Sequence, residues 1–252
     1  MFRIFGIQLS VHASFALLLA YEAYEGWQSG GAAGMGWQVL LVLLFFVCVV
    51  LHELGHSLTA RRYGVQVPRI LLMPIGGMAE FDRIPREPSA ELLITIAGPA
   101  VNFVIFAAML PFFWSTLMSD QTFSEQSWLG VGTLLAAANL VMGIFNLLPV
   151  YPMDGGRILR ALLALRFPYM KATRYAVMTA RILAPVFAVI AFLVLHWTLV
   201  GVLFIFIFFA GDAEYRLLVR REQEAAYWAD MARRVAAASE PTEPPLLHHG
   251  PN

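Results

Sequence analysis

Long apolar blocks separated by short polar joins dominate the pattern of this chain. Six such blocks can be marked, at residues 9–25, 37–60, 90–114, 128–149, 174–195 and 197–211. A bilayer core needs about 20 helical residues, and a spanning segment must satisfy its backbone polar groups internally. The pattern therefore predicts an all-α polytopic membrane protein with about six transmembrane helices.

One stretch between the second and third blocks departs from this helical pattern. Residues 65–83 are rich in β-branched and apolar side chains, and Pro74, Gly76 and Gly77 interrupt any helix there. Such a composition favours strands. We expect a small membrane-associated β-hairpin or sheet, with a plain cytoplasmic loop as the alternative.

Composition and charge agree with a membrane protein. The chain is 59% hydrophobic and only 13% charged, whereas soluble domains carry about 25% charged residues. Its formal net charge is zero, so nothing suggests a nucleic-acid partner. The joins near residues 26–36, 115–127 and 196 contain no Lys or Arg. The positive-inside rule therefore places both termini in the cytoplasm. We expect a multi-pass protein of a bacterial or archaeal cell membrane.

The two ends of the chain carry separate expectations. Polar Gln8, Ser10 and His12 interrupt the start of the apolar stretch that follows Arg3, and no small-residue cleavage site follows, so we expect a retained span rather than a secretory signal. Residues 1–211 are predicted to form one membrane domain. Residues 212–252 are predicted to form a cytoplasmic tail, with a charged helix-like part and a partly disordered Pro-rich end.

A potential metal-binding motif ends the second block. On a helix, His52 and His56 share a face, so both imidazoles can reach one zinc ion. Glu53 lies beside them, in position to accept a proton from a water at the metal. Ionisable groups inside a membrane segment are costly and usually functional. The alternative is a polar helix end whose histidines are solvated beside Arg61 and Arg62.

A catalytic zinc site needs a third protein ligand and one open position. Asp154 is the strongest candidate, because it lies in residues 146–156, where two prolines and two glycines break the helix. Broken backbone at membrane depth is tolerated only where it is buried or lines a cavity. Glu80, Cys48 and His12 are the other candidates, and an ordinary turn with a solvated Asp154 is the alternative.

The two motifs together resemble the site-2 protease family of intramembrane zinc metalloproteases. That family pairs a His-Glu-x-x-His helix with a later Asn-x-x-Pro-x(4)-Asp-Gly element, which Asn146, Pro149, Asp154 and Gly155 match in spacing. Residues 97–102, Ala-Gly-Pro-Ala-Val-Asn, also look like the family's Gly-Pro-x-x-Asn element. The resemblance covers roughly residues 8–211.

This resemblance implies His52, His56 and Asp154 as ligands of one Zn²⁺ per chain, and Glu53 as the general base. It also suggests that Asn146 and Asn102 lie near the active site, where an amide can donate to an oxyanion. We predict that catalytic role for Asn146. For Asn102, hydrogen bonding between helices explains the residue equally well.

The reaction implied is hydrolysis of a peptide bond in a transmembrane protein substrate, in regulated intramembrane proteolysis. A strand edge within residues 65–83 would pair with the unwound substrate. Membrane lipid is the other expected partner, and a regulatory membrane partner is left open. Arg157 and Arg160 are interpreted as interface anchors.

Two other functions use parts of the same pattern. A metal-ion transporter would use these residues as a transit site, but its ligands should be spread along a path rather than clustered at one depth. A catalytically inactive membrane scaffold is disfavoured because the full set of catalytic groups is present.

Overall fold

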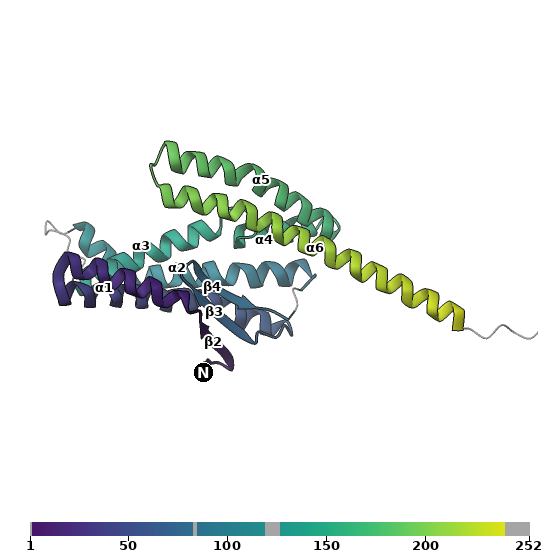
Figure 1. Ribbon diagram of the computed structural model, residues 1–252, viewed down its shortest axis with the longest axis horizontal. Helices are drawn as coiled ribbons and strands as arrows, with labels where there is room; N and C mark the ends of the chain where they lie inside the picture. The colour runs from purple at the N-terminus through teal and green to yellow at the C-terminus, as the bar shows by residue number, and fades with distance from the viewer. Residues whose placement is uncertain (1, 83–84, 119–126, 240–252) are drawn as a thin grey trace, which may run out of the picture.

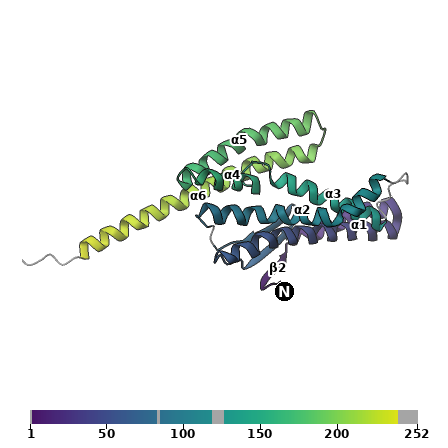
Figure 2. The same cartoon turned by 180° about the vertical axis from the view of Figure 1, so that it is seen from behind.

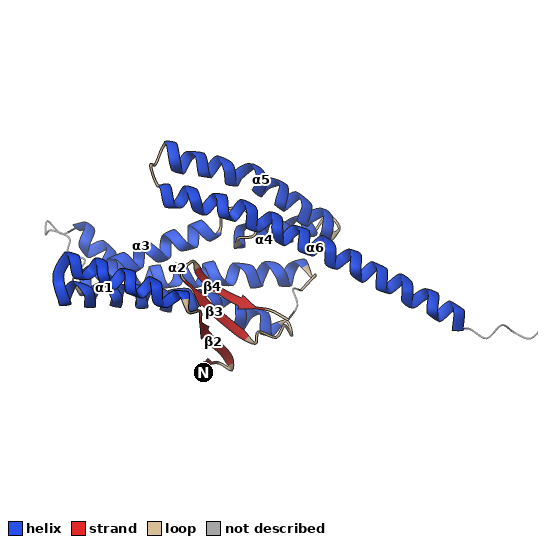
Figure 3. Cartoon of the chain, viewed as in Figure 1, coloured by secondary structure: helices blue, strands red, loops and turns tan. Residues whose placement is uncertain are grey.

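The computed structural model describes residues 2–82, 85–118 and 127–239. A bundle of helices forms most of this part of the chain, and one small sheet lies against the bundle (Figures 1 and 3). The predicted combination of apolar helices with a small sheet is confirmed.

The sheet has four strands in the order β1–β2–β3–β4. The strands are β1 (Phe2–Ile4), β2 (Ile7–Val11), β3 (Arg69–Met73) and β4 (Gly76–Glu80). The outer pairs are antiparallel, whereas β2 and β3 are parallel. The predicted stretch provides β3 and β4, and it leaves β4 at one edge of the sheet.

The N-terminal half of the sheet corrects the prediction for the first apolar block. Residues expected to begin a helix at position 9 belong to β2, and the helix begins only at Ser14. Phe5 and Gly6, between β1 and β2, have positive φ angles of 50° and 77°. Positive φ at both central residues is typical of a two-residue hairpin turn that matches strand twist.

The first two predicted spans lie in one element, α1 (Ser14–Arg62). Gly30 and Gly31 interrupt its helical geometry, with Gly31 at a φ of 57°. A Cβ on Gly26 would lie 2.6 Å from the Gly34 carbonyl oxygen, so the two arms of α1 touch just before and after this turn. We call residues 14–29 the first arm and residues 32–62 the second arm.

The remaining helices follow the other apolar blocks. They are α2 (Pro88–Met118), α3 (Trp128–Asn146), α4 (Asp154–Ala164), α5 (Tyr169–Leu193) and α6 (Thr198–Ser239). Of the described helices, α1, α2, α3 and α5 are long and apolar enough to cross a membrane. The predicted count of six is not confirmed, because blocks one and two share α1 and block six is only the start of α6.

Two apolar cores fix the elements that matter for the site. The first packs the sheet against the second arm of α1, through residues such as Ile70, Leu72 and Val49. The second joins the segment after α3 to α5 and α6, with Val150 and Tyr151 fully buried. The break in the helix is therefore held inside the protein rather than exposed as a turn.

The C-terminal region is more regular than expected. Its predicted helix-like part continues α6 without interruption, and this helix projects beyond the rest of the molecule (Figures 1 and 2). The predicted Pro-rich end lies outside the described residues.

Candidate active site

Two buried imidazoles from the second arm of α1 form the centre of the site. His52 and His56 are only 6% and 7% exposed. His56 Nδ1 lies 2.8 Å from the Ile94 carbonyl oxygen, and His52 Nδ1 contacts Asn102 Oδ1. Both partners are acceptors, so each Nδ1 carries the proton and each Nε2 presents a lone pair.

The orientation of Asn102 supports this assignment. Its Nδ2 donates to Asn139 Oδ1 over 3.0 Å, and Asn139 Nδ2 in turn donates to the Leu135 carbonyl oxygen over 2.8 Å. The amide oxygen of Asn102 is therefore the atom that faces His52. Asn102 thus links α2 to α3, as the helix-bonding interpretation predicts, and it contacts His52 through its amide oxygen.

Asp154 reaches the imidazoles as the first residue of α4. Its Oδ2 lies 3.3 Å from His52 Nε2 and 3.2 Å from His56 Nε2. The two Nε2 atoms are 3.1 Å apart. The structure therefore brings together the three residues that the sequence suggested as metal ligands.

The three atoms fit a zinc ion. Asp154 Oδ2 is buried and has no hydrogen-bond partner among the described residues, so three electron pairs converge on one point. Zinc binds His nitrogen and carboxylate oxygen at about 2.0–2.2 Å in a tetrahedron, which separates neighbouring ligand atoms by about 3.3 Å. Two imidazoles and a carboxylate also suit zinc chemically. Their ligand roles stay a prediction.

Glu53 lies next to this triad and contacts the edge strand of the sheet. Its Oε2 accepts a hydrogen bond from the Ala79 backbone N–H over 3.2 Å. A Cβ on Gly77 would lie 2.7 Å from Glu53 Cγ, so the strand packs directly on this side chain. The strand β4 therefore helps to set the position of the predicted base.

These residues line a cavity of about 220 Å³. Its walls include the three potential ligands and Glu53, residues 77–79 of β4, and also Asn146 and Arg157. Asn146 thus lines the same cavity as the potential ligands, and its catalytic role stays a prediction.

The alternative third ligands lie elsewhere. Glu80 pairs with Arg69 over 2.5 Å, and Cys48 packs in an apolar cluster with residues of α3. His12 is exposed, and its Nδ1 lies 2.7 Å from Ser14 Oγ. Within the described ranges, only His52, His56 and Asp154 form a group that could hold a metal ion.

Two features of the site were missed from the sequence. A Cβ on Gly98 would lie 2.2 Å from His56 Nε2 and 2.8 Å from His52 Nε2, so α2 leaves room for the imidazoles only through this glycine. The Gly-Pro-x-x-Asn element was the available signal. Arg160, interpreted as an interface anchor, is instead fully buried, because its charge is paired inside the protein.

Comparison with known proteins agrees with this geometry. The family model of peptidase family M50 matches residues 40–127 and 116–188, which together span more than half of the chain. The chain belongs to peptidase family M50. The resemblance to site-2 proteases is confirmed by a solved structure titled a site-2 protease from Methanocaldococcus jannaschii. That structure matches this M50 chain with a TM-score of 0.60 and 36% identity, over 85% of this chain and 94% of that one.

Curated relatives carry similar names. A zinc metalloprotease of Methanocaldococcus jannaschii is 40% identical over 86% of this chain, and the match covers 60% of the relative. A putative zinc metalloprotease of Synechocystis is 33% identical over 63% of this chain and 42% of the relative. Stage IV sporulation protein FB of Bacillus subtilis is 29% identical over 55% of this chain. The match therefore covers less than two thirds of each of the first two relatives. With four helices among its described residues that are long and apolar enough to cross a membrane, this M50 chain is an integral membrane protein.

Proposed function

We propose that the chain is a zinc-dependent intramembrane endopeptidase, which hydrolyses a peptide bond in or near a transmembrane segment of a membrane protein. The observation that carries the proposal is the convergence of His52, His56 and Asp154, whose ligand atoms all lie within 4.8 Å of one another. Glu53 lines the same cavity. The names of the relatives support the same activity.

Each residue of the site has a proposed role in the reaction. His52, His56 and Asp154 hold the zinc ion, which when bound polarises a carbonyl group and acidifies a water molecule. Glu53 accepts a proton from the attacking water and later passes it to the leaving amine. Asn146 donates a hydrogen bond to the developing oxyanion. Asn102 and the Ile94 carbonyl keep the imidazoles in the tautomer that leaves Nε2 free.

The membrane placement proposed here follows the apolar blocks and the charge pattern. The two arms of α1 and the apolar start of α6 would add to the crossings made by α2, α3 and α5, for six segments in all. Both termini lie in the cytoplasm of a bacterial or archaeal cell. Residues 1–211 then form the protease domain and residues 212–252 the cytoplasmic tail. The proposed partners are membrane lipid and a transmembrane substrate, within regulated intramembrane proteolysis.

The edge strand β4 offers a way to hold an unwound substrate. A helical segment hides its peptide bonds, so it must be extended before hydrolysis, and strand pairing replaces the lost hydrogen bonds. Gly77, Met78 and Ala79 of β4 line the cavity beside Glu53. Pairing along this edge would bring the extended segment close to the proposed metal.

Replacement of Glu53 by Gln tests the proposal. In detergent or vesicles, the unmodified protein should cut a model transmembrane substrate and contain one zinc per chain. E53Q should lose about 10²- to 10⁴-fold in turnover while it keeps the zinc. A metal transporter would keep metal flux in E53Q, and an inactive scaffold would show no cleavage in either form. Either result would overturn the proposal.

A further inference from the structure

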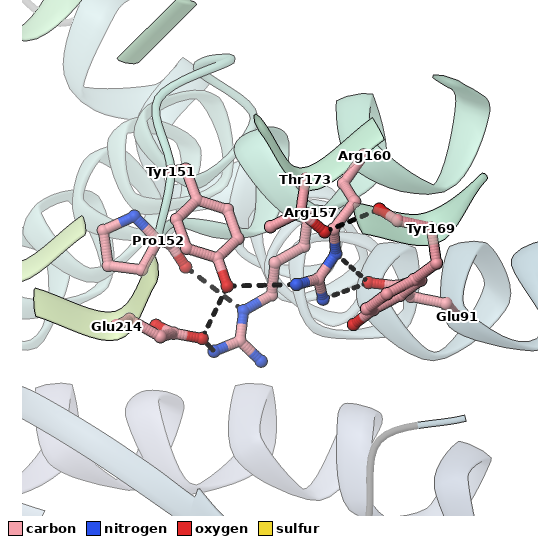
Figure 4. Close-up of polar contacts among 8 residues, drawn as sticks. All are labelled: Glu91, Tyr151, Pro152, Arg157, Arg160, Tyr169, Thr173 and Glu214. Carbon is pink, nitrogen blue, oxygen red and sulfur yellow. Dashed lines mark hydrogen bonds and ion pairs between the residues drawn. The ribbon is translucent and has the colours of Figure 1, made fainter. Parts of the chain in front are cut away.

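A buried network of charged and aromatic side chains joins α4 to α2, to α6 and to the segment before Asp154 (Figure 4). Arg160 Nε donates to Glu91 Oε1 of α2 over 2.7 Å, and its Nη2 contacts the same oxygen. Arg160 Nη1 donates to the Tyr151 hydroxyl over 3.0 Å. Arg160 is fully buried and Glu91 is 3% exposed. The pair anchors α4 to α2 and to the segment that precedes Asp154.

Tyr151 carries this network towards the cavity. Its hydroxyl donates to Glu214 Oε1 of α6 over 2.7 Å. Burial raises the pKa of the Tyr151 phenol well above its usual value, so the hydroxyl stays protonated and acts as a donor at neutral pH. Glu214 is therefore fixed by a neutral partner, and its carboxylate remains free to pair with a cation.

The cation that pairs with Glu214 is Arg157, which is also the member of the network that lines the cavity. Its Nη2 donates to Glu214 Oε1 over 3.2 Å, and its Nε donates to the Pro152 carbonyl oxygen over 3.2 Å. The residue lies three positions after Asp154 on the same helix, so both side chains project from one face. Arg157 lines the cavity together with the metal-binding triad and Glu53.

The guanidinium is not saturated by these contacts. An arginine offers five N–H donors, and the hydrogen bonds of Arg157 to described residues come from Nε and Nη2; among the eight residues drawn in Figure 4, its second terminal nitrogen has no partner. Its side chain is 28% exposed, in contrast to fully buried Arg160. A cation that is held rigidly and still has free donors is suited to bind an oxygen acceptor inside the cavity.

We propose that Arg157 donates a hydrogen bond to a backbone carbonyl oxygen of the substrate segment in the cavity. Glu214, Tyr151 and the Pro152 carbonyl aim the guanidinium, and Glu91 with Arg160 anchors that arrangement. The acceptor is a main-chain oxygen, so this contact serves substrates of different sequence. The inference rests on the proposed peptidase function, since it assigns a substrate contact within the same cavity.

A purely architectural role for Arg157 predicts a different outcome. If Arg157 only latched α4 to α6 through its ion pair with Glu214, removal of either charge would have the same effect. Glu214→Gln keeps the volume and an acceptor oxygen for Tyr151, and it leaves the guanidinium at the cavity. Comparison of R157M with E214Q therefore separates substrate contact from latching.

The test measures kcat/KM for a model transmembrane substrate, together with zinc content. We expect R157M to lose about 10- to 100-fold in kcat/KM, the range for a hydrogen bond to a charged group, with zinc content unchanged. E214Q should lose less than about fivefold. R166M, which removes an exposed arginine beyond the end of the same helix, is the matched control and should behave as the unmodified protein.

A measurement of substrate binding tests the inference independently of turnover. In the E53Q background, the affinity for the same substrate should fall about tenfold when R157M is added. An unchanged affinity and kcat/KM in R157M would overturn the inference, as would equal losses in R157M and E214Q. Failure of the peptidase proposal would look different, because the unmodified protein would then cleave nothing while the R157M effect on binding persisted.

Discussion

Two buried polar clusters meet at α4. Each contains a buried carboxylate oxygen without a hydrogen-bond partner among the described residues, Asp154 Oδ2 in one and Glu91 Oε2 in the other, but only Glu91 is paired with an arginine. In the metal-binding triad of His52, His56 and Asp154, three acceptor atoms converge and Asp154 Oδ2 has no donor among the described residues. In the ion-pair cluster of Glu91, Arg160 and Tyr151, the arginine charge meets a carboxylate, a hydroxyl and the Tyr151 ring, whose centroid is 5.3 Å from Arg160 Cζ.

Because of this difference, we expect the two clusters to contribute differently to stability and to metal binding. Burial of polar atoms without partners costs free energy, so the triad lowers the stability of the metal-free protein and needs a cation to complete it. Burial of the paired charges is offset by their mutual attraction and hydrogen bonds. The ion-pair cluster therefore stabilises the fold, whereas the triad is arranged to bind a metal ion.

The largest effect is expected in the ion-pair cluster. Replacement of Arg160 by Met should lower the free energy of unfolding by about 3–5 kcal/mol, because Glu91 would keep an uncompensated buried charge. Denaturant titration in detergent, followed by circular dichroism, measures this loss.

A paired replacement sharpens the same prediction. The double variant Arg160→Met with Glu91→Leu should recover at least half of the lost stability, since no unpaired charge remains. A double variant as unstable as the single one would show that the ion pair itself is not what Arg160 provides.

A smaller effect, measured as metal affinity, is expected at Gly98. In G98A the new Cβ would lie 2.2 Å from His56 Nε2 and 2.8 Å from His52 Nε2, so the imidazoles must move. Overpacking of this kind costs about 1–3 kcal/mol, and zinc affinity should fall by about 10- to 100-fold. Competition with a chelator measures the affinity. G36A, where no atom lies within 4 Å of the added Cβ, is the control and should bind zinc normally.

The smallest effect is expected at Asn102. N102A removes the acceptor that fixes His52 Nδ1, and loss of such a partner typically lowers metal affinity by about 10- to 100-fold. We expect the lower part of that range, because Ile94 still orients His56. If N102A bound zinc as tightly as the unmodified protein and lost only stability, Asn102 would belong to the scaffold.

Much of the site was predictable because its determinants are local. The spacing of His52 and His56 fixes a shared helix face, and the prolines and glycines before Asp154 mark a broken helix. The hairpin of β3 and β4 was equally local. Residues 9–11 were assigned to a helix because they begin an apolar block that continues into one. Their strand is fixed by parallel pairing with β3, far along the chain.

The contacts of α2 with the site depend on tertiary packing. Gly98 matters only because α2 packs its backbone against the imidazoles, and periodicity does not reveal that approach. Arg160 looked like an interface anchor because its partner, Glu91, lies on a different helix. Residues 26–36 were likewise expected to be a non-helical connection between two spans. In the structure, helix continues on both sides almost to the turn at Gly30 and Gly31.

The central claim is that a broken helix brings Asp154 to the two imidazoles as the third zinc ligand. The most direct measurement is zinc content of the purified D154A protein, together with the unfolding free energy of its metal-free form. We predict that zinc is lost, while the metal-free form loses no more than about 1 kcal/mol of stability, since the change removes a buried carboxylate oxygen that has no hydrogen-bond donor among the described residues. Retention of one zinc per chain in D154A would contradict the account.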